Sequence, residues 1–287
     1  MRSWHIFVAA VIFTCSIYSC YSPRYVYSPV AHNVPVLAKK GDSKLAFFYA
    51  SNLKEKATIN GIERKSSSSG IDVQGAYAIT NHFAVQAAYS HRFEKNFADF
   101  NINSPDTSTI NYTRNLTELG VGYFTFISGN KQSIFQVFAG VGIGKSSFAD
   151  FYEPLSSPAF QRFFKMNVTR LYLQPAFMIR YKNTFATSLS SRFSVVYFKN
   201  ISTDYSEQEL ESYQLKALGN GANIFWEPAF VNTVGFKKLP GLQFELQLGM
   251  AFLMTRHFVD YRTFNLSAGI VLDMPELFKG KKQAPKN

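Results

Sequence analysis

Apolar and polar residues alternate along most of the chain, beginning just after Gly41. The clearest case is residues 243–252, where Phe, Leu, Leu, Met and Phe occupy one parity and Gln, Glu, Gln, Gly and Ala the other. Because successive side chains of a β-strand point to opposite faces, this segment has one apolar face and one polar or small face. The same split predicts ten strands, at residues 42–51, 69–80, 83–95, 112–127, 133–148, 165–182, 185–200, 222–236, 243–255 and 262–274.

The connections between these strands alternate in length. Long polar connections at 52–68, 96–111, 149–164 and 201–221 alternate with short ones at 81–82, 128–132, 183–184 and 237–242. A soluble half-buried sheet alternates in hydropathy too, but it has no reason to place its long loops at one rim. Short turns at one rim, long loops at the other and an even strand number are typical of a membrane barrel. We therefore predict an all-β fold, a closed antiparallel transmembrane β-barrel of ten strands, with eight strands as the alternative.

Charged residues within the predicted strands fall on the polar parity. A basic side chain facing lipid near the middle of the membrane would cost about 2–4 kcal/mol, so we expect these residues to face the lumen and to pair across strands. A membrane admits no open sheet edge, so the sheet must close around them. Inward glycines such as Gly120 and Gly140 leave room for the long side chains. The predicted lumen charge network consists of Lys44, Asp72, Arg92, Glu118, Arg170, Arg180, Arg192, Glu227 and Glu245.

The last predicted strand carries a C-terminal motif. Its residues Ser267, Gly269, Leu272 and Met274 resemble the insertion signal of outer-membrane barrels, in which a polar residue and a glycine precede two apolar residues at fixed spacing. Leu272 and Met274 share the lipid-facing parity of Ile270, as that signal requires. The resemblance implies that the barrel-assembly machinery is a partner during insertion. Many such barrels end at this motif, whereas thirteen residues follow it here.

The N-terminus has the pattern of a lipoprotein-type signal peptide over residues 1–19. Arg2 supplies the positive charge, and residues 6–13 are almost wholly apolar. Residues 17–20, Ile-Tyr-Ser-Cys, resemble a bacterial lipobox, which implies that Cys20 is the acylated first residue of the mature protein. The bulky Tyr at position 18 is unusual there, and the alternative is a cysteine of no special role. Residues 21–287 contain no cysteine, so the mature domain has no disulfide, thiol nucleophile or cysteine metal site.

Residues 20–41 contain three prolines and no strand pattern, and they predict a lipidated periplasmic tether. Within them, Tyr27–Pro35 and Lys40–Asp42 resemble the segment after the lipobox in small outer-membrane β-barrel proteins of Bacteroidota, whose function is generally uncharacterised. The resemblance implies an outer-membrane location. Because no acidic run for surface export follows Cys20, we expect the anchor in the periplasm-facing leaflet, with both termini at the short-turn rim. Residues 275–287 predict a basic periplasmic tail.

Composition and charge agree with this fold. Aromatic residues make up 16% of the chain, with 29 Phe and 16 Tyr, and they suit the lipid-facing parity and its interfacial girdles. No apolar run reaches the roughly 18 residues of a spanning helix. The net charge of +11 lies largely in the tail, the tether and the first long loop, without the aromatic–basic interleaving of a nucleic-acid site. We expect outer-membrane lipids and lipopolysaccharide as partners and no nucleic acid; the extracellular ligand stays unspecified.

Three patterns could carry chemistry. Ala139–Ser146 fits a relaxed phosphate-loop spacing, but it continues the strand alternation, which favours glycines lining a lumen. His32 stands alone, which favours a structural role over metal binding. Several acidic and histidine residues near the long-loop rim are of the types that omptin-like barrel proteases use, although general-base work needs groups within about 3 Å of the proton. These are His91, Asp99, Asp204, His257 and Asp260. We expect no cofactor, metal or catalytic residue.

The sequence therefore predicts a non-enzymatic outer-membrane lipoprotein of the bacterial envelope, with a narrow or closed barrel and extracellular loops for binding or a structural role. A small-solute pore is the alternative, in which Arg192 and Glu227 line the conduction path. An omptin-like or lipid-modifying hydrolase is the third possibility.

Overall fold

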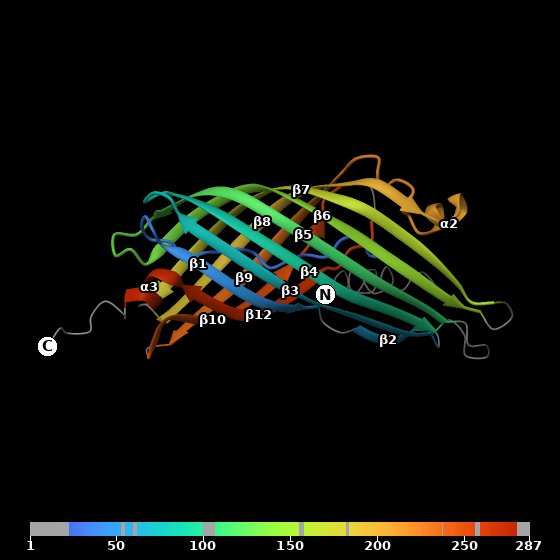
Figure 1. Ribbon diagram of the computed structural model, residues 1–287, viewed down its shortest axis with the longest axis horizontal. Helices are drawn as coiled ribbons and strands as arrows, with labels where there is room; N and C mark the ends of the chain where they lie inside the picture. Colours follow the sequence, from blue (N-terminus) through green and yellow to red (C-terminus); the bar gives the residue numbers. More distant parts are fainter. Residues whose placement is uncertain are drawn as a thin grey trace, which may run out of the picture.

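The computed structural model describes residues 23–52, 55–59, 62–99, 107–154, 158–181, 184–236, 238–255 and 259–279. Its main feature is a ring of antiparallel strands, closed because β1 pairs with β12 on one side and with β3 on the other. In ring order the strands are β1 (Ser43–Ser51), β3 (Ile62–Ala78), β4 (Phe83–Asp99), β5 (Thr107–Phe126), β6 (Ser133–Glu153), β7 (Phe160–Tyr181), β8 (Phe185–Thr203), β9 (Ala222–Phe236), β10 (Leu239–Met250) and β12 (Phe264–Asp273). The predicted ten-stranded closed barrel is confirmed, and the eight-stranded alternative is wrong (Figure 1).

Short elements extend the two ends of the barrel. The strand β2 (Glu55–Ile59) pairs with the start of β3, and β11 (Phe252–Leu253) pairs with β9. The helix α2 (Glu207–Ser212) lies in the loop after β8, and α3 (Met274–Lys279) follows β12 at the opposite end (Figure 1). We call the α2 end the long-loop rim and the α3 end the short-turn rim. Within the described ranges, no helix has the length and apolarity needed to cross a membrane.

The alternation of the sequence becomes an alternation of burial around the wall. In β1 the inward Ala46 and Phe48 are buried, whereas the outward Phe47 and Tyr49 are 49% and 60% exposed. Large apolar side chains stay exposed around the whole ring, with Val121 and Ile143 each at 65%. A protein in water would not leave such a continuous apolar surface uncovered. The outer face is therefore the lipid-facing face of a transmembrane barrel.

Most strands run farther toward the long-loop rim than the alternation predicts. β6 reaches Glu153, not residue 148, and β3 begins at Ile62, within a stretch predicted as loop. At the usual rise and tilt, the 21 residues of β6 give about 50 Å of height, roughly twice the 25 Å apolar band of such barrels. Above that band the outward face need not be apolar, as at Ser67 and Ser69, the outward members of the four consecutive serines of β3. The pattern therefore fades where the wall leaves the membrane.

Inward glycines make room for specific aromatic side chains. A Cβ atom on Gly140 would lie 2.5 Å from the Tyr172 hydroxyl oxygen, and one on Gly122 would lie 2.4 Å from the Phe138 ring. The phosphate-loop-like stretch 139–146 is part of β6, with its glycines on this inward face. The sequence pattern predicted that the space beside these glycines would hold Arg and Glu side chains. Among these glycines only Gly142 faces them, with its Cβ position 3.1 Å from Glu118 Cγ.

The two described ends of the chain lie at opposite rims, which corrects the expectation that both lie at the short-turn rim. At the C-terminal end, β12 finishes at Asp273 beside Lys44, the second residue of β1. At the N-terminal end, Pro23 and Arg24 contact Asn96 and Asp150, which lie three residues from the long-loop ends of β4 and β6.

Candidate functional site: a lumen filled by the N-terminal segment

Residues 23–38, which we call the lumen segment, run through the inside of the barrel from the long-loop rim to the short-turn rim. Val26, Val34 and Leu37 are at most 2% exposed. Sixteen residues of extended chain span about 50 Å, which matches the height of the wall. A turn at Gly41, whose φ of 87° suits glycine, then leads into β1. The predicted periplasmic tether therefore lies, over these residues, within the lumen.

The lumen segment belongs to no sheet apart from one bridge between Tyr27 and Tyr261. Its backbone groups still need partners because they are removed from water. Inward side chains of the wall supply them. The Gln247 amide accepts from His32 N at 2.9 Å and donates to His32 O at 2.8 Å, which imitates a strand neighbour. Asp72 accepts from Ala31 N at 3.2 Å, and Gln74 donates to Ala31 O at 3.0 Å.

Four charged residues surround the middle of the lumen segment. Arg170 lies 3.0 Å from Glu118 and 3.8 Å from Glu227. Arg192 lies 3.5 Å from Glu118 and 3.7 Å from Glu227. The two arginines are 1% and 2% exposed and are the largest fully buried side chains of the described chain. Each cation therefore has two carboxylate neighbours, as a buried charge requires.

Tyr27 of the lumen segment enters this group of charges. Its hydroxyl donates to Glu227 Oε1 at 2.8 Å and accepts from Arg170. Its ring stacks on Phe225 of β9, with centroids 4.0 Å apart. Arg192 donates to Val30 O at 3.1 Å. The charge network of the wall is thus also the binding site for the lumen segment.

Two further ion pairs lie closer to the short-turn rim. Arg92 makes a bidentate contact with Asp72, with distances of 2.6 and 2.8 Å. Lys44 contacts both oxygens of Glu245 at 3.2 Å. Eight of the nine predicted lumen charges are thus buried inside the barrel and paired. The ninth, Arg180, is half-buried near the short-turn rim, and its backbone N–H donates to Gln132 O.

A second polar cluster near the long-loop rim escaped the sequence interpretation. Glu94 pairs with Arg114 and, at 3.1 Å, with Arg262. Arg114 also donates to Tyr25 O, and the Arg262 guanidinium lies 4.1 Å from the Tyr25 ring centroid. Glu94 has the same inward parity as Arg92 on β4, and Arg114 has the same inward parity as Glu118 on β5. The sequence pattern therefore already indicated that both face the lumen. Arg262 was missed for another reason. It begins the predicted strand 262–274 on the lipid-facing parity of Phe264 and Leu266, whereas in the structure it precedes β12 and its side chain is buried.

Arg24 fixes the start of the lumen segment. Its guanidinium pairs with Asp150, to which Tyr205 donates at 2.9 Å, and lies 3.6 Å from the Tyr213 ring centroid. Its backbone N–H donates to Asp260 at 2.9 Å. Burial raises the pKa of Tyr205, and the Asp150 carboxylate raises it further, so the phenol keeps its proton and donates. Asp150 lies beyond the predicted strand, where the alternation had ended.

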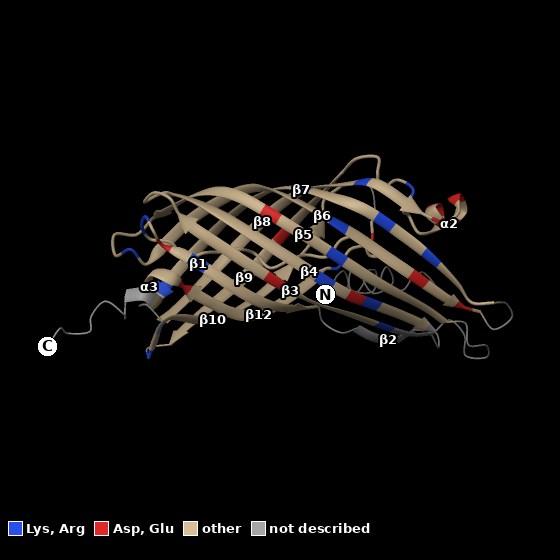
Figure 2. Cartoon of the chain, viewed as in Figure 1, with Lys and Arg blue, Asp and Glu red and all other residues tan. Residues whose placement is uncertain are grey.

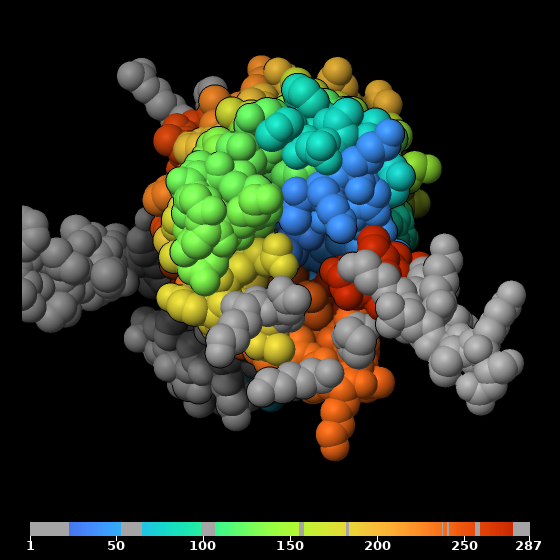
Figure 3. All heavy atoms as spheres, turned by 90° about the vertical axis from the view of Figure 1, so that its left-hand side faces the viewer, coloured from blue at the N-terminus to red at the C-terminus, as the bar shows by residue number. Residues whose placement is uncertain are grey.

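Apolar packing completes the filling of the lumen. Val26 and Tyr27 join a large cluster with Phe148, Phe164 and Phe198 at the long-loop half. Nearer the short-turn rim, Val34 packs with Ile134, and Leu37 with Phe124 and Phe138. Seen from the short-turn rim, blue atoms of the N-terminal part of the chain occupy the space between the turns (Figure 3). A cavity of about 40 Å³ remains beside Val26 and Ser28, enough for a water molecule but not for a passage.

Among the acidic and histidine residues considered for a hydrolase, the three whose side chains the structure describes make separate contacts. His91 lies on the outward parity of β4, with its ring against Phe93. Asp204 accepts from Phe163 N at 2.7 Å, and Asp260 from Arg24 N. His257 lies outside the described residues, as does the side chain of Asp99. His32 is buried, with Nδ1 2.9 Å from the Ser190 hydroxyl oxygen, and the described residues contain no group of metal-ligating side chains.

The predicted insertion motif divides between wall and helix. Ser267 is buried on the lumen face, and Leu272 lies on the outward parity opposite Leu45. A Cβ atom on Gly269 would lie 2.1 Å from Phe47 O, so the wall tolerates no side chain there. Met274 begins α3 and does not continue the strand, so the strand alternation from which its lipid-facing position was predicted ends before it. The proposed lipidation site Cys20 lies outside the described residues.

Comparison with protein-family models and with curated proteins finds no match. Among solved structures, the chain is similar to the translocator domain of the autotransporter NalP from Neisseria meningitidis, with 11% identity, a TM-score of 0.44 and coverage of 81% of this chain and 87% of that one. It is also similar to the outer membrane protease OmpT from Escherichia coli, at 10% identity, a TM-score of 0.43 and coverage of 83% and 98%. An outer membrane channel from Pseudomonas putida F1 matches at 12% identity, a TM-score of 0.37 and coverage of 84% and 99%.

Proposed function

We propose that this chain is an outer-membrane protein of the bacterial envelope whose barrel is closed by its own N-terminal segment, and which serves as a scaffold for binding at its long-loop rim. The observation that carries the proposal is the lumen segment. It is held by wall side chains along its length, and its ion pairs and apolar contacts occupy the space that a solute would need. The molecule is then non-conducting in its resting state.

The outer face of the wall supports the membrane location. Exposed aromatic and aliphatic side chains surround the ring, and the charged side chains of the strands mostly face the lumen. Along the strands, the half nearer α3 carries few charged residues apart from its rim, whereas the half nearer α2 carries more (Figure 2). A closed barrel of this kind has no open sheet edge, which a membrane requires. We place the half nearer α3 in the bilayer and the half nearer α2 outside the cell.

The long-loop half supports the binding role. The strands continue well above the apolar band and carry α2 and the β2 extension, so they raise a folded polar surface above the membrane. α2 is a formed element: the Ser206 hydroxyl accepts from Glu209 N, and Glu209 accepts from Ser206 N, which together make a capping box. Lipopolysaccharide and the barrel-assembly machinery remain proposed partners.

Acylation of Cys20 remains part of the proposal, with a changed position. Cys20 lies only three positions before Pro23, a reach of about 11 Å. Because Pro23 lies near the long-loop rim, this reach would keep Cys20 on the outer side of the membrane and away from the periplasm-facing leaflet. Radiolabelled palmitate incorporation tests this modification. Wild-type protein should be labelled and Cys20→Ala should not; label retained in the variant would refute it.

Planar-bilayer recording tests the closed state. The wild-type protein is expected to insert, as judged by heat-modifiable gel mobility, without stable single-channel steps. Stable single-channel conductance steps from inserted wild-type protein would refute the closed-barrel proposal and favour the small-solute pore. As a matched positive control, replacing Tyr27, Val30 and Val34 with glycine weakens the lumen segment without altering the wall, and should produce flickering conductance.

A further inference from the structure

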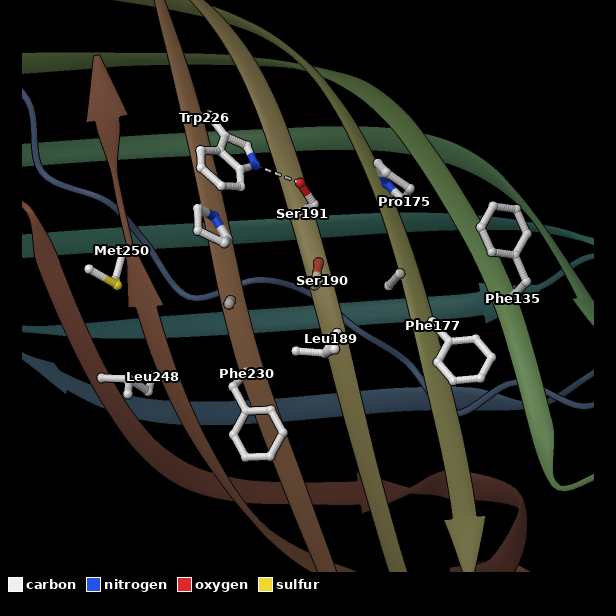
Figure 4. A pocket seen from close by; sticks show the side chains of 13 residues that line it. Phe135, Pro175, Phe177, Leu189, Ser190, Ser191, Trp226, Phe230, Leu248 and Met250 are labelled. Carbon is white, nitrogen blue, oxygen red and sulfur yellow. Dashed lines mark hydrogen bonds between the residues drawn. The ribbon is translucent and has the colours of Figure 1, made fainter. Parts of the chain in front are cut away.

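The outer wall carries a furrow of about 490 Å³ across β7, β8 and β9. At its centre, three neighbouring strands present small or short side chains outward at the same level. These are Pro175, Ser191 and Pro228, with Ser191 paired directly to Pro228. On the short-turn side, the larger Phe177, Leu189 and Phe230 form one wall of the furrow (Figure 4).

The furrow coincides with two interruptions of the sheet. The ladder between β7 and β8 passes from Leu173–Phe193 to Ala176–Ser190, leaving out Pro175. Likewise, β9 pairs with β10 as far as Ala229 and with β11 from Trp226, leaving out Pro228. Proline has no N–H to donate, so each gap lies where a ladder bond cannot form. Two gaps on either side of the β8–β9 pair fix the position of the furrow.

The chemistry of the furrow is that of hydrocarbon. None of its lining residues is charged, and the outward polar group is the Ser191 hydroxyl, which already accepts from the Trp226 indole at 2.8 Å (Figure 4). Ser191 lies six residues after Phe185, or about 14 Å above the short-turn rim at the usual rise and tilt. That is near the middle of the apolar band, and the furrow is continuous with the lipid-facing surface around it.

We propose that this furrow is a preferential binding site for one acyl chain of a membrane lipid. The proposal rests on the membrane location proposed above. Elsewhere on the wall, exposed side chains such as Leu119 and Val121 project from the surface, so an acyl chain would contact them on one side only. An acyl chain in the furrow would lie over Pro175 and Pro228, and the aromatic rings that line the furrow would flank it. Because the contact area is larger in the furrow, an acyl chain should stay there longer than on the rest of the wall.

Trp226 allows a direct test, because the sequence has only one other tryptophan, Trp4, within the predicted signal peptide. The protein is reconstituted into vesicles with increasing fractions of a phosphatidylcholine brominated on its acyl chain, and tryptophan fluorescence is measured. Trp226 should reach half-maximal quenching at a several-fold lower brominated fraction than a control tryptophan. The control is Ile71→Trp with Trp226→Phe, on β3, which lies across the ring from β8. Ile71 is 51% exposed and seven residues from the end of its strand.

Ser191→Leu fills the furrow from the lipid side, so folding, checked by gel mobility, should be unaffected. It should shift the Trp226 quenching curve to that of the control. Identical curves for wild-type Trp226 and the Ile71 control would overturn the proposed site while leaving the membrane location intact. Absence of quenching at both positions would instead refute the membrane location. Quenching at the control alone, together with cross-linking of Ser191→Cys protein into dimers, would overturn the acyl-chain site in favour of a second copy of this chain.

Discussion

At the scale of single residues, Tyr27 couples the lumen segment to the wall. Its hydroxyl lies between Arg170 and Glu227, and its ring lies on Phe225. An aromatic residue gives this contact at little cost in side-chain entropy, and its hydroxyl satisfies charged groups that water does not reach. The same cluster explains why the wall carries two fully buried arginines: each has two carboxylates, and Arg170 also has the phenol.

Replacing single members of this cluster should destabilise the barrel to different degrees. Tyr27→Phe keeps the stacking and removes one buried hydrogen-bonding group, at about 1–3 kcal/mol. Glu227→Ala leaves Arg170 and Arg192 short of a carboxylate, at about 3–5 kcal/mol. Urea unfolding in vesicles measures both as changes in the free energy of unfolding. Tyr77→Phe, at a lipid-facing site 48% exposed, is the control and should change it by less than about 0.5 kcal/mol. Equal effects of Glu227→Ala and the control would contradict this account.

At the scale of elements, the lumen segment behaves as a strand whose neighbours are side chains. Gln74, Gln174 and Gln247 donate to the carbonyls of Ala31, Asn33 and His32. Pro23, Pro29 and Pro35 reduce the number of N–H groups that need acceptors. Apolar and polar residues do not alternate in such an element, because the wall surrounds it on all sides. That is the physical reason why it looked like a tether in the sequence.

An engineered disulfide tests the position of the segment. His32 Nδ1 lies 2.9 Å from Ser190 Oγ, and residues 21–287 contain no cysteine. His32→Cys with Ser190→Cys should therefore form an intramolecular disulfide in the folded barrel, seen as a mobility shift reversed by reductant. His32→Cys with Ser188→Cys, one inward position away on β8, is the matched control and should cross-link far less. Equal cross-linking of both pairs would show that the segment is not held in this register.

At the scale of the whole molecule, the wall was predictable and its filling was not. The ten strands, their order and the inward placement of residues such as Glu118 and Arg192 follow from alternation, because lipid imposes an apolar outward face on every strand. Beyond the membrane that constraint ends, so the upper parts of β3 and β6 were predicted as loops. The pairing of Tyr27 with residues of β7 and β9 depends on contacts more than 140 positions apart, which periodicity does not encode.

The orientation of the lumen segment predicts which side of the membrane the residues just before Pro23 face. In intact cells, a membrane-impermeant maleimide should label Ser22→Cys protein and should not label Glu276→Cys protein, in which the cysteine is on α3 at the other rim. Labelling of wild-type protein under the same conditions measures any reaction of the maleimide with Cys20 and is subtracted. The opposite labelling pattern would mean that the barrel is inserted the other way around. Labelling of both variants only after cell lysis would place the N-terminus in the periplasm.

The turn at Gly41 joins the lumen segment directly to the first strand of the ring, and the ring closes where that strand meets the last one, with Phe47 opposite Ile270. This seam has consequences for assembly. The pairing of β1 with β12 joins the most distant parts of the wall, and such remote contacts form late. Until then the sheet is open, and residues 23–38 can be laid against its concave side without being threaded through a finished ring. Assembly in that order has no stage at which a complete ring encloses an empty, conducting channel.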